Sequence, residues 1–318
     1  MKRVLIYTAA VLLLAFGLAG CAQKSAASDL SAGDGKISIV TTIFPPYDFA
    51  RAITGGLADV RMLIDPGAEV HTFDPSTDDI IRIQNADVFI YTGGENDAWV
   101  NTVLESMDTQ DKTVIRLMDT VTPLEEETVE GMQAEAAAGK VKGEYDEHVW
   151  TSPKNAMQMI GAISEALCGI DAANAGAYRQ NAADYSAQIK TVDEQIQAVA
   201  DASENKLLIV ADRFPFRYLT EEFGLDYRAA YSGCSSETEV SAGTLAYLIN
   251  TIETQHIGYI YYIEMSNQDV AEILSEQTGA QMLLLHSCHN VTKKEFDAGA
   301  TYLSLMRQNA KNLETGLE

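Results

Sequence analysis

Short apolar stretches alternate with amphipathic stretches along most of the chain. In the first half, β-branched and aromatic runs predict strands at 36–42, 60–65, 87–93 and 113–118. Each of the first three runs is followed by a segment with helical periodicity, such as YDFARAITGG at 47–56. The second half repeats this rhythm, with strand-like runs at 206–212, 225–231, 257–264 and 280–286. Apolar strands that alternate with amphipathic helices indicate parallel β-sheets.

Between the two halves lies a segment, 171–204, that is rich in Ala, Gln, Asp and Glu and has no helix-breaking proline. This composition predicts one long rigid helix. The sequence therefore predicts an α/β protein of two similar lobes, 37–170 and 205–318, each a mostly parallel β-sheet flanked by helices and joined by that helix. A ligand of such a protein binds in the cleft beyond the carboxyl ends of the strands.

The first residues have the layout of a secretory leader. Lys2 and Arg3 precede an apolar run that ends in small residues at Cys21, which predicts a signal peptide over 1–20. Leu-Ala-Gly-Cys at 18–21 resembles a bacterial lipobox, and the resemblance implies a lipid on Cys21; the alternative is a plain signal peptide with Cys21 there by accident. The small, polar segment 21–36 predicts a flexible tether. We expect the mature chain to be extracytoplasmic and anchored by lipid to the bacterial cell membrane.

The charge of the chain narrows the choice of partners. The formal net charge is −24 and the sequence pI is about 4.4. Such an acidic protein repels the phosphates of nucleic acids, so DNA and RNA binding are not expected. Acidity also concentrates cations near the surface, which gives weak support to a cation ligand.

The residues able to bind a metal are few, and most follow predicted strands. Of the five histidines, only His256 falls on the opposite side, at a helix end. The others, together with a carboxylate that ends the strand at 206–212, fall where one cleft is expected; they are His71, His148, Asp212, His286 and His289. Each alone is more often a capping or solvated residue, but their joint placement predicts a metal site. Imidazoles together with a carboxylate suit tetrahedral Zn²⁺, whereas Mn²⁺ prefers more oxygen donors.

Several motifs resemble the metal-binding lipoproteins of zinc and manganese ABC importers. DPGAEVHTFDPS at 65–76 is similar to that family's Pro-Gly-x-x-x-His-x-(aromatic)-(acidic)-Pro motif, and DEHVWTSPKNA at 146–156 is similar to its Asp-x-His-(aliphatic)-Trp motif. TTIFPPYDFARAITGG, FRYLTEEFGL and TYLSLMRQN also fit, so the likeness covers about residues 37–317. The resemblance implies a monomeric binding protein that captures a divalent ion, chiefly Zn²⁺ with Mn²⁺ or Fe²⁺ as alternatives. It also implies delivery to the permease of an ABC transporter.

The family uses four ligands, and two of them transfer directly to His71 and His148. The third is usually His or Glu, but here the best register places Arg213 at that position, and a guanidinium cannot ligate a metal. Asp212, one residue earlier, could replace it. His286 falls at the fourth position, where His289 or Cys288 could compete.

An enzyme is the main alternative to a transport role. A zinc hydrolase would need an open coordination position and a general base, for which Glu264 is a candidate. The sequence contains no His-Glu-x-x-His and no Gly-x-Ser-x-Gly motif, so we expect a non-enzymatic protein. A lipoprotein that binds metal only for stability is a further alternative.

Two other features bear on the cleft. The acidic segment Pro123–Glu147 is poor in apolar residues, which predicts a mobile loop, either simply solvated or weakly recruiting cations.

Cys234 and Cys288 each follow a strand of the second lobe and could form a disulfide. Alternatively, His-Ser-Cys-His at 286–289 could form a thiolate-containing metal patch. Asp146, Glu69 and Glu264 are candidates to orient the imidazoles.

Overall fold

A computed structural model describes residues 35–132, 144–233 and 239–318. The predicted signal peptide and most of the predicted tether lie outside these ranges, as do the centre of the acidic segment and Cys234. No helix in the described ranges combines the length and the apolar character needed to cross a membrane. The described residues all belong to one compact unit.

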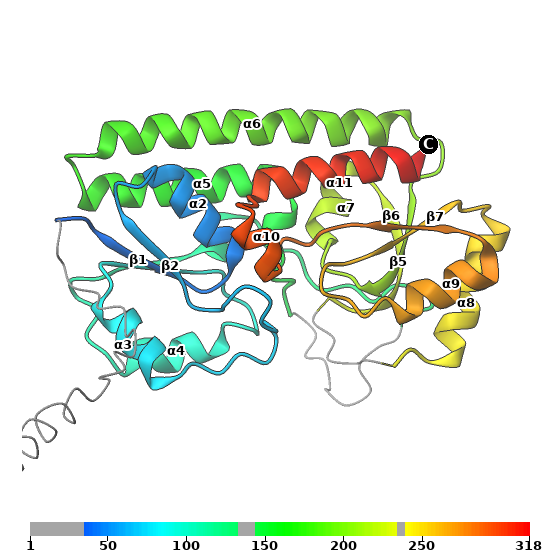
Figure 1. The fold of residues 1–318 in the computed structure, drawn as a ribbon, viewed down its shortest axis with the longest axis horizontal. Coiled ribbons are helices and arrows are strands. Elements are labelled where there is room, and N and C mark those ends of the chain that lie inside the picture. Colours follow the sequence, from blue (N-terminus) through cyan, green and yellow to red (C-terminus); the bar gives the residue numbers. More distant parts are fainter. Residues whose placement is uncertain (1–34, 133–143, 234–238) are drawn as a thin grey trace, which may run out of the picture. The chain divides into compact units, whose positions relative to one another are not determined.

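The first lobe is built on a four-stranded parallel sheet with the order β2-β1-β3-β4 (Figure 1). Its helices and strands are β1 (Ser38–Thr41), α2 (Phe44–Thr54), β2 (Asp59–Met62), α3 (Thr77–Asn85), β3 (Val88–Tyr91), α4 (Ala98–Glu105), β4 (Thr113–Arg116), the 3₁₀ helices η1 (Leu117–Thr120) and η2 (Val149–Thr151), and α5 (Pro153–Ile170). The strands β1 and β3 are buried on both faces because helices cover both.

The second lobe repeats this plan with the strand order β6-β5-β7-β8, again all parallel. Its elements are β5 (Leu207–Arg213), α7 (Arg217–Phe223), β6 (Asp226–Tyr231), α8 (Ala242–Thr254), β7 (Tyr259–Tyr262), α9 (Asp269–Thr278), β8 (Gln281–Leu284), α10 (Lys293–Asp297) and α11 (Tyr302–Leu317). The predicted fold of two similar parallel α/β lobes is therefore confirmed.

The helix α6 (Ala175–Ala202) runs through the segment where one long helix is predicted. It packs against α5 and α2 of the first lobe and against α11 and α7 of the second, and Figure 1 shows it lying along α5 and α11. One apolar cluster on the inner faces of both sheets includes Ile39, Trp150 and Leu208, so the lobes share a core. Two smaller clusters fill the outer faces, under α3 and α4 in one lobe and under α8 and α9 in the other.

Hydrogen bonds between the lobes fix the segment that follows the acidic region. The indole Nε1–H of Trp150 donates to the Ser287 carbonyl at 2.7 Å, and the Tyr302 hydroxyl donates to the Trp150 carbonyl at 2.7 Å. Tyr185 on α6 donates its hydroxyl to Asp48 on α2 at 2.5 Å, and the same carboxylate accepts the Tyr302 backbone N–H at 3.0 Å. These buried bonds join the start of α11 to the first lobe.

The acidic segment is more ordered at its ends than a mobile loop. Glu125 and Tyr145 form an antiparallel bridge, and the backbone N–H of Glu126 donates to the Glu144 carbonyl at 2.9 Å. The Tyr218 hydroxyl of α7 donates to the Asp146 carbonyl at 2.7 Å. The two ends thus converge on the segment that carries His148.

Candidate metal centre

His71 lies in the loop after β2, in a turn that begins at Pro66 and Gly67. Gly67 has φ +84°, a left-handed conformation that favours glycine. The Asn290 side chain of the second lobe donates to the carbonyls of Asp65 and Ala68, at 3.0 and 2.9 Å, and so holds this turn. The second lobe therefore positions the loop of the first lobe that carries His71.

Glu69 orients the His71 ring. Its Oε1 lies 2.7 Å from Nδ1 of His71 and also accepts the His71 backbone N–H at 3.2 Å. These hydrogen bonds, chiefly the one from the ring, lower the pKa of Glu69 to about 2, so the carboxylate is ionised. An ionised carboxylate can only accept, which places the His71 proton on Nδ1 and leaves the Nε2 lone pair free.

His148 is held in the same way, and it is fully buried. Asp146 Oδ1 accepts the His148 backbone N–H at 2.8 Å and lies 3.1 Å from Nδ1 of the ring. Burial lowers the pKa of His148, but the nearby Asp146 and Glu147 carboxylates outweigh it, and the net shift is upward. A Cβ on Gly233 would lie 2.9 Å from the Phe214 carbonyl and 3.3 Å from the His148 ring, so only glycine packs here without displacing them.

His289 completes the group from the second lobe. Its ring centroid lies 5.1 Å from that of His71 and 5.2 Å from that of His148, nearly perpendicular to both. One nitrogen of each of the three imidazoles can be chosen such that all three atoms lie within 4.8 Å of one another. Burial and the neighbouring His71, His148 and Arg213 hold the pKa of His289 well below its usual value, so the ring is neutral.

The three imidazoles can hold a metal ion because they converge and line a small cavity of about 80 Å³. Nε2 of His71, His148 and His286 are each buried without a hydrogen-bond partner among the described residues, but only His71 and His148 of these three line the cavity. Buried polar atoms are normally paired, so such orphaned lone pairs indicate a ligand. Neutral imidazoles oriented by carboxylates are typical of zinc sites.

The other predicted ligands are placed differently. Nδ1 of His286 accepts the Cys288 backbone N–H at 2.9 Å, so this nitrogen is occupied. Nε2 of His286 is buried without a hydrogen-bond partner, but it does not converge with the nitrogens of the other three histidines. Asp212 lines the cavity, but its Oδ1 accepts the Arg213 backbone N–H at 2.8 Å. The structure thus brings together His71 and His148 with His289, and the full ligand set remains a prediction.

Cys288 is not a member of the group. Its thiol is free and fully buried, with Sγ 3.8 Å from the His286 carbonyl, and burial raises its pKa well above the usual value. A buried, protonated thiol is a poor metal ligand. The expected disulfide partner, Cys234, lies outside the described residues.

Arg213 and Glu264 are also in the cavity wall. Nη1 of Arg213 lies 3.2 Å from Nδ1 of His71 and 3.6 Å from Oε1 of Glu69. Glu264 accepts the Ser287 backbone N–H at 2.7 Å and also accepts the Ser287 hydroxyl, so it supports the His289 loop rather than facing the imidazoles. Of the three candidates to orient the rings, Glu69 and Asp146 contact histidines of the group directly.

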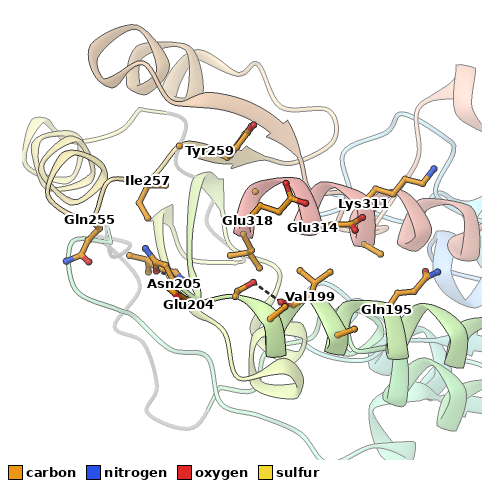
Figure 2. Close-up of a pocket in the computed structure, with 18 of the residues that line it drawn as sticks. Gln195, Val199, Glu204, Asn205, Gln255, Ile257, Tyr259, Lys311, Glu314 and Glu318 are labelled. Atoms are coloured by element: carbon orange, nitrogen blue, oxygen red, sulfur yellow. Dashed lines mark hydrogen bonds between the residues drawn. The ribbon is translucent and has the colours of Figure 1, made fainter.

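A larger hollow, of about 1180 Å³, lies elsewhere, where the end of α6 and the end of α11 meet the starts of β5 and β7 (Figure 2). The side chains drawn there include Gln195, Glu204, Asn205 and Lys311. Its one histidine is the exposed His256, and none of the three clustered imidazoles lines it. This hollow is larger, but the three imidazoles line the smaller cavity. The smaller cavity is therefore the candidate metal site.

Comparison with known proteins agrees with this geometry. The chain is 31% identical over 315 residues to the zinc-binding lipoprotein AdcA of Streptococcus pneumoniae, a match that covers 99% of this chain and 61% of AdcA. It is 28% identical to the high-affinity zinc uptake system protein ZnuA of Bacillus subtilis, over 94% of this chain and 93% of that protein. The crystal structure of the Zn(II)-bound ZnuA-like domain of S. pneumoniae AdcA superposes with a TM-score of 0.74 at 28% identity, covering 89% of this chain and 99% of that domain.

The chain thus spans about three-fifths of the length of AdcA and nearly the whole of the B. subtilis protein. The model of the ZnuA family, described as the periplasmic component A of the zinc-uptake complex, matches residues 39–316. The chain belongs to this family of metal-binding transport components, which are not enzymes.

Proposed function

We propose that this protein captures extracytoplasmic Zn²⁺ between its lobes and delivers it to the permease of an ABC importer. The observation that carries the proposal is the convergence of His71, His148 and His289 on one buried cavity, with two orphaned Nε2 atoms. Three nitrogen donors favour Zn²⁺ over Mn²⁺ and Fe²⁺, both through donor type and through the Irving–Williams order. Mn²⁺ and Fe²⁺ remain the alternative cargoes.

The proposal includes the predicted organisation of the chain. Residues 1–20 act as a lipoprotein signal peptide, Cys21 carries the lipid, and 21–36 tether the chain to the bacterial membrane surface. The lobes 37–170 and 205–318 then hold the ion as a monomer, with 171–204 as the connection. Asp212 lines the same cavity as these histidines, so it remains the protein side chain that competes for the fourth position.

The test is the metal content of the purified protein after zinc loading and desalting, measured by elemental analysis. We expect about one zinc per chain in the wild type, as a single tetrahedral site requires. His148→Ala and His289→Ala should lose it, whereas His256→Ala, a change at an exposed histidine, should retain it. Full zinc content in all three variants would refute the site.

His286→Ala decides between the ligand sets. Because Nδ1 of His286 already accepts the Cys288 N–H, this variant should keep its zinc while losing some stability. Loss of zinc from folded His286→Ala, with retention in His289→Ala, would restore His286 as the ligand. Loading with equimolar Zn²⁺ and Mn²⁺ in the same experiment identifies the preferred cargo, and preferential uptake of Mn²⁺ would overturn the assignment of zinc.

A further inference from the structure

The described residues supply three nitrogen donors but no fourth ligand in the present arrangement. Zn²⁺ takes four ligands, and a site with three protein ligands keeps the fourth position for water or another exogenous group. The two carboxylates of the second lobe that line the cavity do not converge with the three imidazoles in this arrangement. Glu264 accepts from the Ser287 backbone and hydroxyl, and Asp212 accepts from the Arg213 backbone. What completes the fourth coordination position therefore depends on the other residues that line the cavity.

Arg213 is the one permanently charged cation among the cavity-lining residues that the structure describes. Its Nη1 lies 3.2 Å from Nδ1 of His71, but that nitrogen already donates its proton to Glu69 and cannot also accept. Nη1 forms an ion pair with the Glu69 carboxylate, but its distance of 3.6 Å from Oε1 is beyond hydrogen-bond range. The guanidinium therefore stands beside the metal-binding nitrogens with donors that no described acceptor fully occupies.

A guanidinium next to a bound dication is repulsive, and the single charge of Glu69, which pairs with both His71 and Arg213, offsets only part of that repulsion. A small anion that ligates the metal removes this repulsion and at the same time accepts charge-assisted hydrogen bonds from Arg213. We propose that this site takes its metal together with a small metal-ligating anion, a halide or a carboxylate-type oxyanion, which fills the fourth position and is held by Arg213. The inference rests on the proposed function, because it describes how the same site completes its coordination.

The experiment measures Zn²⁺ affinity of the purified chain by competition with a chromophoric chelator, at constant ionic strength. The salt is either weakly coordinating perchlorate, or chloride, or formate. In the wild type, chloride or formate should tighten Zn²⁺ binding by about tenfold or more, the worth of a hydrogen bond to a charged group. The anion that acts at the lower concentration identifies the class, halide or carboxylate. In Arg213→Gln this gain should fall below about twofold.

Arg217→Gln is the matched control, since Arg217 lies in the same lobe but pairs with Glu221 and Glu127; it should keep the full anion effect. Arg213→Lys keeps the positive charge and should keep part of the anion effect. If Arg213→Gln does not fold, Arg213→Lys replaces it in the test. The visible spectrum of the Co²⁺-loaded protein gives an independent readout, because chloride or formate should change it in the wild type and not in Arg213→Gln.

Zn²⁺ affinity that is equal in all three salts would overturn the inference and leave metal capture intact. Tighter binding by Arg213→Gln in every salt would also overturn it, because it would show simple repulsion by an unscreened charge. An absence of zinc binding in any salt would instead refute the proposed function, and the inference with it.

Discussion

Replacing Glu69 by glutamine tests whether the carboxylate that orients His71 sets the affinity for metal. Oε1 of Glu69 lies 2.7 Å from Nδ1 of His71, and loss of such a partner typically costs 10–100-fold in metal affinity, about 1.4–2.8 kcal/mol. Glutamine can still accept the Nδ1–H through its amide oxygen, so only the charge is lost, and we expect a loss of about tenfold. Glu69→Ala removes the acceptor as well and should approach a loss of about a hundredfold.

The assay is Zn²⁺ competition with a chromophoric chelator, with Glu105→Gln as the control, since Glu105 is an exposed carboxylate on α4. The pKa of Glu69 is lowered to about 2, so its contribution is present above the ordinary carboxyl pKa and is lost only as the pH falls toward 2. The ratio of wild-type to Glu69→Gln affinity should therefore be constant from about pH 6 to about pH 8. An affinity of Glu69→Gln within twofold of the wild type would refute the assigned role of this carboxylate.

Three further predictions concern stability. Burial and the adjacent Asp193 raise the pKa of Glu222 from 4.5 to about 7, so its contribution to the free energy of unfolding is present below pH 4.5 and is lost as the pH rises through 7. Glu222→Gln should flatten the pH profile of the wild type in this window, by at most about 1.4 kcal/mol per pH unit in urea titrations; parallel profiles would contradict the shift. Tyr185→Phe removes a buried hydroxyl that donates to Asp48 at 2.5 Å, and it should lower the free energy of unfolding by about 1–3 kcal/mol; a change under 0.5 kcal/mol would contradict that estimate. Zinc at a hundred times its Kd should raise the free energy of unfolding of the wild type by about 2.7 kcal/mol, and chelation should remove this gain; an equal gain in the histidine variants would show binding elsewhere.

The fold could be predicted from the sequence because each strand is a short apolar run bounded by turns. The positions of His71 and His148 also followed, since each sits in a motif with its flanking turn residues. Which of His286 and His289 lies beside His71 and His148 could not be predicted, because it depends on the backbone between them. Cys288 adopts φ +61°, a conformation rare outside glycine, and this directs the two rings differently.

The carboxylates that orient the imidazoles have a sequence signal of their own. Glu69 and Asp146 each stand two residues before a histidine of the group, a spacing at which one carboxylate oxygen can reach both the backbone N–H and Nδ1 of that histidine. By contrast, nothing in the sequence states where the guanidinium of Arg213 lies. Its approach to His71 depends on how the two lobes pack.

The bond between Asn290 and the turn before His71 has a consequence for the speed of metal capture. Asn290 follows His289 directly and fixes the opposite loop through two carbonyls, so the entropy of ordering that loop is lost when the chain folds and not when the ion arrives. The arriving ion then meets nitrogens that are already in place. Under the proposed function, we therefore expect capture to be limited by how fast the ion sheds its own hydration water, not by a search of the chain for the right loop conformation.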